Sequence, residues 1–140
     1  MTDPPFEILE HTADIGVRAR GPSLAALFEN AAAGLLDVSF DPAAVTPRES
    51  RPLAAQAADR ETLLLNWLQE VVWLVDGEGW LPNRVEVREI SETRVTGLAR
   101  GEPRDPSRHA MRVIVKAVTY HLLSVREERG AWVAEVYLDI

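Results

Sequence analysis

The stretch between Asp59 and Gly77 most constrains the fold, because its apolar residues cover almost every side of a helix. One broad face carries apolar residues at helical spacing: Leu64, Trp67, Leu68, Val71, Leu74 and Val75. Three further residues widen that face: Leu63, Val72 and Trp73. A helix that is apolar on most sides is buried on most sides, so we expect this one at the centre of the core. Asp59 is a suitable N-cap, and Asp76 with Gly77 ends the helix.

A second helix is predicted after the break at Gly21-Pro22-Ser23, with Ser23 as its N-cap. Its apolar face is again marked by helical spacing: Leu24, Leu27, Phe28, Ala31 and Leu35. We expect this helix to end near Leu36 and Asp37.

Alternation of apolar and polar residues predicts strands elsewhere, at residues 6–20, 85–90, 95–99 and 132–140. The β-branched content of residues 111–125 favours a further strand, with a helical turn in its N-terminal half as the alternative. Hairpins are expected at Ser91-Glu92-Thr93 and at Arg129-Gly130. Prolines make residues 40–58 a mostly exposed connection, with an edge strand at 51–57 as the alternative, and residues 101–106 are predicted to form a loop. The pattern predicts one α+β domain over residues 1–140, with an antiparallel or mixed sheet and two main helices packed on it.

Composition excludes several classes of function. The chain has no cysteine, so disulfides, thiolate metal sites and cysteine nucleophiles are ruled out, and no glycine-rich nucleotide loop or nucleophile elbow occurs. A formal net charge of -7 disfavours stable direct binding to nucleic acid and suits a cation or a basic protein surface. The acidic, proline-rich N-terminus is unlike a signal peptide, and no apolar run approaches the roughly 18 residues of a membrane helix. We therefore expect a cytoplasmic protein without membrane association.

Carboxylates lie near both ends of the chain. Asp14 stands at the entrance of a predicted strand, and Asp139 and the α-carboxylate of Ile140 end the last one. If the first and last strands are neighbours, these oxygens form a cluster suited to Ca²⁺, Mg²⁺ or Mn²⁺. The simpler alternatives are that Asp14 only caps a turn and that the last strand merely ends there.

Polar residues also interrupt the apolar segment before the last hairpin. Lys116 either extends outward or pairs with a buried acid. His121, beside Tyr120, is either a ligand or proton-transfer group or a solvent-facing strand residue. Glu102, in a predicted loop, has the pattern of a solvated acid, and His109 carries no clear signal.

Five motifs, in chain order, resemble those of the archease family. They are His11-Thr12-Ala13-Asp14-Ile15-Gly16, Leu64-Leu65-Asn66-Trp67-Leu68-Gln69-Glu70, Gly101-Glu102-Pro103, Lys116-Ala117-Val118-Thr119-Tyr120-His121 and Leu138-Asp139-Ile140. The resemblance spans nearly the whole chain, and the two outer motifs with the lysine-to-histidine motif are specific in combination.

The resemblance implies a compact α+β fold and a protein that is not itself an enzyme. Archeases are protein cofactors of the RtcB-type tRNA-splicing ligase, which joins RNA ends with GTP and Mn²⁺; they speed guanylylation of the ligase histidine and support multiple turnovers. The family's metal site, with Ca²⁺ in structures, corresponds to Asp14, Asp139 and Ile140. The motifs further indicate a functional edge facing the partner, made of His11, Glu102, Lys116, Thr119, Tyr120 and His121.

Two other functions compete with this interpretation. A metal-dependent phosphohydrolase would use Asp14, Asp139 and His121, and would cleave a phosphoester without a partner. A chaperone-like interaction module would expose an apolar patch of more than a few hundred Å².

Overall fold

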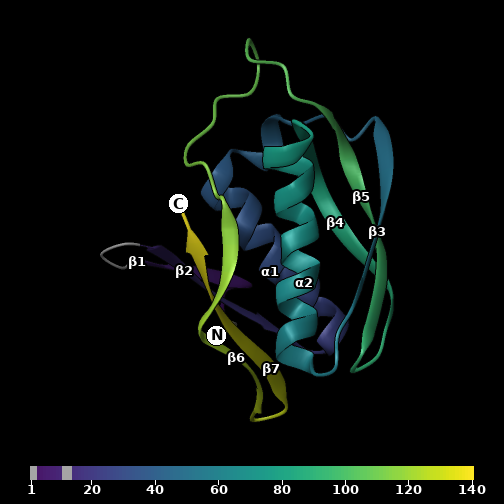
Figure 1. Cartoon of the computed structure of the whole chain (residues 1–140), viewed down its shortest axis with the longest axis vertical. Coiled ribbons are helices and arrows are strands. Elements are labelled where there is room, and N and C mark those ends of the chain that lie inside the picture. The colour runs from purple at the N-terminus through teal and green to yellow at the C-terminus, as the bar shows by residue number, and fades with distance from the viewer. Residues whose placement is uncertain (1–2, 11–13) are drawn as a thin grey trace.

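The computed structural model describes residues 3–10 and 14–140, and these residues form two antiparallel sheets that enclose two helices (Figure 1). The elements are β1 (Phe6–Glu10), β2 (Asp14–Gly21), α1 (Leu24–Ser39), β3 (Glu49–Gln56), α2 (Arg60–Val72), a π-helical turn (Trp73–Gly77), β4 (Trp80–Ile90), β5 (Arg94–Pro103), β6 (Ala117–Glu128) and β7 (Ala131–Asp139). The terminal sheet has the strand order β1-β2-β7-β6, and the middle sheet has the order β3-β5-β4. The predicted α+β class and helix pair are confirmed, but the strands divide into two sheets where one was expected.

Both helices contact both sheets. Helix α1 packs on β2 and β4, and α2 packs on β6 and β3, so the helix pair forms the middle layer of the molecule (Figure 1). The largest fully buried side chains come from both helices and both sheets: Trp67, Trp80, Phe28, Phe40, Leu27, Leu35, Leu36, Leu63, Leu64, Leu68, Leu81 and Leu138. No helix in the described part of the chain is long and apolar enough to cross a membrane.

Both predicted helix starts are confirmed by their caps. The Ser23 hydroxyl accepts a hydrogen bond from the Ala26 N–H at 3.1 Å, and the Asp59 carboxylate accepts one from the Thr62 N–H at 2.8 Å. These bonds satisfy amide groups that the first turn of a helix leaves without an internal partner. Helix α1 continues to Ser39, two residues beyond the predicted end.

One residue of the central helix is not buried as predicted. Trp67 is fully buried, whereas the side chain of Trp73 is 60% exposed. Trp73 follows the exposed Glu70 by three residues, and residues at that spacing share one side of a helix. Trp73 therefore belongs to the outer side of α2 and not to its apolar face.

The proline-containing connection contains a true edge strand, as the alternative interpretation held. Strand β3 pairs only with β5 among the strands described, and Pro52 lies opposite Leu98. Proline is tolerated where its missing N–H faces away from the ladder. The predicted strand at residues 111–125 begins only at Ala117; before it, an isolated bridge joins Met111 to Phe40.

Candidate functional site

The terminal sheet brings the two ends of the chain together. Strand β2 pairs with β7 so that Asp14 lies directly opposite Asp139, and β6 pairs with β7 so that Ala117 also lies opposite Asp139. Directly opposite residues of an antiparallel pair project from the same face. Asp14 and Asp139 thus share the face that points away from the helices, whereas Leu138 and Val118, one step along, are buried in the core.

The donors at this edge fit a hard divalent cation. Asp139 is exposed, Ile140 is 42% exposed, and Asp14 is half-buried. Like charges placed directly opposite are destabilising unless a cation is shared between them. Within residues 3–10 and 14–140, no three His, Cys, Asp or Glu side chains gather into a metal cluster. A cation held by Asp14 and Asp139 would therefore take its remaining oxygens from the main chain, the Ile140 carboxylate or water.

Tyr137 is a residue of this edge that sequence reasoning missed. Its side chain lies on the outer face yet is only 7% exposed, because it covers Gly16 on β2. A Cβ on Gly16 would lie 2.8 Å from a ring carbon of Tyr137, so only glycine leaves room for this ring. The glycine in an otherwise side-chain-bearing strand was the available signal. The ring of His121 meets Tyr137 edge-on at 5.8 Å, and the Thr119 hydroxyl donates to the Tyr137 carbonyl at 3.1 Å.

A bulge in β6 displays two of the predicted edge residues. The register passes from Thr119 opposite Tyr137 to Ser124 opposite Glu135, so residues 120–123 face a single residue of β7. Leu122 has a positive φ of 54°, which is uncommon for a residue with a side chain. Bulges redirect side chains near functional sites, and this one leaves Tyr120 65% exposed.

Main-chain contacts hold the start of β6 in place. The Lys116 N–H donates to the Asp139 carbonyl at 2.8 Å, while the Lys116 side chain is exposed. The Val118 N–H donates to the Gln69 side chain of α2 at 3.0 Å. Lys116, Thr119 and His121 therefore lie along the same edge as Asp139.

Glu102 is not the solvated loop acid that the sequence suggested. It belongs to β5 in the middle sheet, and its side chain is 1% exposed. Arg48 and Arg108 each donate to its carboxylate at 2.9 Å, and the Thr46 N–H donates at 2.8 Å. Chiefly through the hydrogen bonds from Arg108 and Thr46, the pKa of Glu102 is held far below its usual range.

His109, which gave no sequence signal, completes the surroundings of Glu102. It is 2% exposed, and its Nδ1 accepts from the Asp105 N–H at 2.8 Å. Its Nε2, 3.0 Å from Glu102, therefore carries the hydrogen and donates to the carboxylate. Glu102 and His109 fix the beginning of the segment that leads to Lys116.

Predicted edge residue His11 lies outside the described residues.

Comparisons with known proteins agree with this architecture. The model of the archease protein family matches residues 6–140. Protein archease of Methanopyrus kandleri is 40% identical over 139 residues, covering 97% of this chain and 99% of that protein. The protein of the same name from Sulfurisphaera tokodaii is 38% identical over 137 residues, covering 96% and 98%.

Two solved structures share the fold. The solution structure of Methanobacterium thermoautotrophicum protein 1598 has a TM-score of 0.80 at 34% identity, covering 97% of this chain and 99% of that one. The crystal structure of a Thermotoga maritima protein, described as an archease and possible chaperone, has a TM-score of 0.62 at 26% identity, covering 100% and 98%. A family match over nearly the whole chain and the shared fold lead to one conclusion: this chain belongs to the archease family.

Proposed function

We propose that this protein activates an RtcB-type RNA ligase in the cytoplasm, promoting guanylylation of the ligase histidine and multiple turnovers, without catalysing a reaction itself. Membership of the archease family supports the proposal. The observation that carries it is the register of β2 and β7, which sets Asp14 opposite Asp139. A net charge of -7 supports a protein partner over direct binding to RNA.

In this proposal Asp14, Asp139 and Ile140 hold a divalent ion, Ca²⁺ or, in its place, Mg²⁺ or Mn²⁺. When bound, the ion would neutralise negative charge that develops on a phosphoryl group during transfer. Tyr137 and Thr119 keep the ends of β6 and β7 in register through the hydrogen bond between them. Lys116 and His121, on the same edge, would contact the partner or a phosphate.

The direct test measures guanylylation of the ligase with and without this protein. Asp14→Asn and Asp139→Asn each keep the shape of the edge but remove a charge, so we expect stimulation to fall at least tenfold. Glu127→Gln, an exposed acid of β6, serves as the matched charge control and keeps full stimulation. Calorimetric titration with CaCl₂ should show binding to the wild type and not to either aspartate variant. Full stimulation by both aspartate variants would reject the proposal.

A chaperone-like interaction role is the second candidate. The Thermotoga maritima relative is described as a possible chaperone. Here the observation in favour is a set of exposed apolar side chains, Ile114 at 61%, Tyr120 at 65% and Leu122 at 57%. Suppression of aggregation of an unrelated heat-denatured protein, without any effect on the ligase, would favour this role. Phosphate release by the purified protein alone would instead favour the phosphohydrolase.

A further inference from the structure

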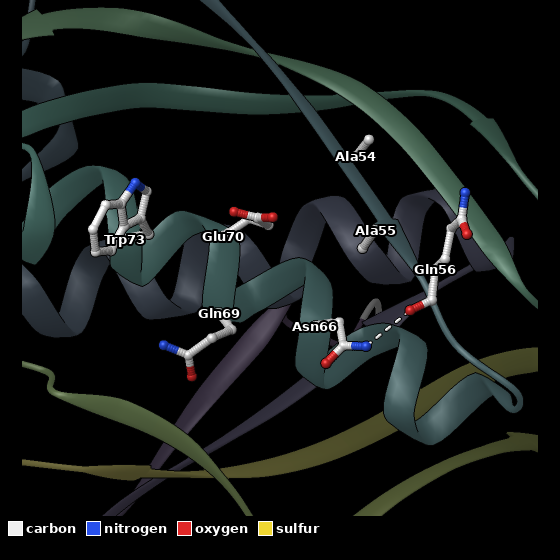
Figure 2. A pocket seen from close by; sticks show the side chains of 7 residues that line it. All are labelled: Ala54, Ala55, Gln56, Asn66, Gln69, Glu70 and Trp73. Carbon is white, nitrogen blue, oxygen red and sulfur yellow. Dashed lines mark hydrogen bonds between the residues drawn. The ribbon is translucent and has the colours of Figure 1, made fainter.

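An open groove of about 590 Å³ lies between α2 and the edge strand β3 (Figure 2). Its lining residues are Ala54, Ala55, Gln56, Asn66, Gln69, Glu70 and Trp73. On the β3 side the lining side chains include two alanines, so another backbone can approach the strand closely. The groove is separate from the acidic edge, but the two are linked through Gln69, which accepts the Val118 N–H of β6.

The main chain of β3 offers hydrogen-bonding groups to this groove. The Ala57 N–H donates to Thr93 across the ladder, whereas the Gln56 carbonyl accepts from the side chain of Asn66 on α2. Successive residues of an antiparallel edge strand direct these groups alternately toward the partner strand and away from it. The N–H and C=O of Ala54 therefore face outward with the Gln56 carbonyl. Pro52, the next residue on that side, has no N–H to offer and limits the length of any added strand.

The wall opposite β3 carries an exposed tryptophan that is held in place. Trp73 is 60% exposed, and its ring lies against Gly77, where a Cβ would come within 2.7 Å of a ring carbon. The indole thus packs against a position that carries no side chain. Elsewhere in this chain, a guanidinium group lies over an indole: Arg51 over Trp80 at 5.1 Å, and Arg60 over Trp132 at 4.9 Å.

Glu70 adds a negative charge beside this tryptophan. It is exposed, and Figure 2 shows its carboxylate with the Trp73 indole on the side of α2 that faces Ala54 and Ala55. An aromatic face and a carboxylate together bind a guanidinium group by cation–π attraction and a charge-assisted hydrogen bond.

We propose that this groove docks an extended, arginine-bearing segment of a partner protein. The backbone of the segment pairs with Ala54 as an added strand, and its arginine lies between Glu70 and Trp73. Charge selects this occupant: the groove wall presents a carboxylate, and the whole chain carries a net charge of -7. The inference rests on the proposed function because it takes the ligase as the partner. In it, the groove contributes to the affinity for the ligase and not to the activation of the ligase.

The first test titrates an RtcB-type ligase with the wild type, Trp73→Ala, Glu70→Gln and the control Glu127→Gln. We expect the first two variants to raise the half-saturating concentration about tenfold and to leave the maximal guanylylation rate unchanged. For Asp139→Asn we expect the opposite pattern: the maximal guanylylation rate falls and the half-saturating concentration stays the same. A half-saturating concentration within twofold of wild type for both groove variants overturns the inference and leaves the proposed function standing.

The second test needs no ligase, so it decides the matter even if the wild type fails to stimulate one. A blocked heptapeptide, Thr-Val-Thr-Arg-Thr-Val-Thr, is titrated to millimolar concentration into ¹⁵N-labelled protein, beside a twin in which neutral citrulline replaces arginine. We expect shifts of the Trp73 indole N–H and the Ala54 amide with the arginine peptide, and shifts at least fivefold smaller with citrulline. Equal shifts with both peptides, or none with either, would refute the arginine site.

Discussion

Two carboxylate sites in this molecule are built in opposite ways. Around Glu102, buried in the middle sheet, the protein supplies the compensating charge through Arg48 and Arg108. At the end of the terminal sheet, Asp14 and Asp139 face one another across paired strands, so each adds like charge to the other. The first site is neutralised internally by arginines, whereas the second sets two acids opposite each other at the end of a sheet.

The contrast separates an acid that stabilises the fold from a pair of acids that our proposal assigns to binding an ion. A buried carboxylate surrounded by donors stabilises the native chain but offers nothing to a ligand. Two aspartates set opposite each other cost stability in the absence of a cation and gain it when one binds. The contacts of Glu102 suit it to anchoring the chain, whereas our proposal assigns Asp14 and Asp139 to holding an ion.

The largest expected effect comes from neutralising the buried acid. Glu102→Gln leaves Arg48 and Arg108 without their carboxylate, and we expect the Tm to fall by on the order of 10 °C. Circular dichroism during heating measures this change. Glu127→Gln should leave the Tm nearly unchanged, and the Ca²⁺ affinity of folded Glu102→Gln should match wild type. An unaltered Tm would show that Glu102 does not stabilise the folded chain, and the contrast between the two sites would be wrong.

Acid should remove the contribution of Glu102 to stability. Because the pKa of Glu102 is lower in the folded protein than in the unfolded chain, its contribution is fully present above the ordinary carboxyl range. That contribution is lost as pH falls from about 4.5 toward the depressed value. We expect the Tm difference between wild type and Glu102→Gln to shrink steadily over this interval. A difference that stays constant down to the lowest measurable pH would contradict the argument.

A substitution that leaves charge untouched tests the geometry of the acidic edge. In Gly16→Ala the new methyl group would meet the Tyr137 ring and Leu9, at 2.8 and 2.9 Å. Overpacking of this kind costs about 1–3 kcal/mol. We expect chemical denaturation to show that loss, with weaker Ca²⁺ binding because β2 shifts against β7. Wild-type stability and affinity would mean that the ring moves aside freely.

The smallest expected effect is a gain in stability and not a loss. Without divalent ions, Asp14→Asn should raise the free energy of unfolding by about 0.2–1 kcal/mol, because one of two facing charges is removed. The Ca²⁺-dependent rise in Tm seen for the wild type should be absent from this variant. Urea titrations with EDTA and with CaCl₂ provide both measurements. A variant that is destabilised in EDTA would show that the facing aspartates do not repel.

Features encoded by neighbouring residues were predictable from the sequence. The N-caps at Ser23 and Asp59 depend on bonds to amides three residues ahead, and the Arg129-Gly130 turn depends on two left-handed residues, with φ of 53° and 80°. The helices followed from the spacing of their apolar residues. Each of these signals depends on residues that are close to one another in the sequence.

Features that depend on distant partners were not predictable. Glu102 looked solvated because its ion-pair partner Arg48 lies 54 residues away along the chain. Tyr137 looked like an ordinary strand residue because its cover is supplied by Gly16 and His121 on other strands. The division of the strands between two sheets depends on which distant strands pair, as β2 does with β7, and no neighbouring residue records that choice.

The side-chain amides of α2 have a mechanical consequence. Asn66 holds the Gln56 carbonyl of β3, and Gln69, three residues later, holds the Val118 N–H of β6. Helix α2 thus holds one edge strand of each sheet, β3 and β6, by a side-chain hydrogen bond. A displacement of either edge strand therefore strains the hydrogen bond that holds the other strand. Hydrogen exchange at Val118 should therefore speed up when Asn66 is replaced, although that side chain touches the opposite rim.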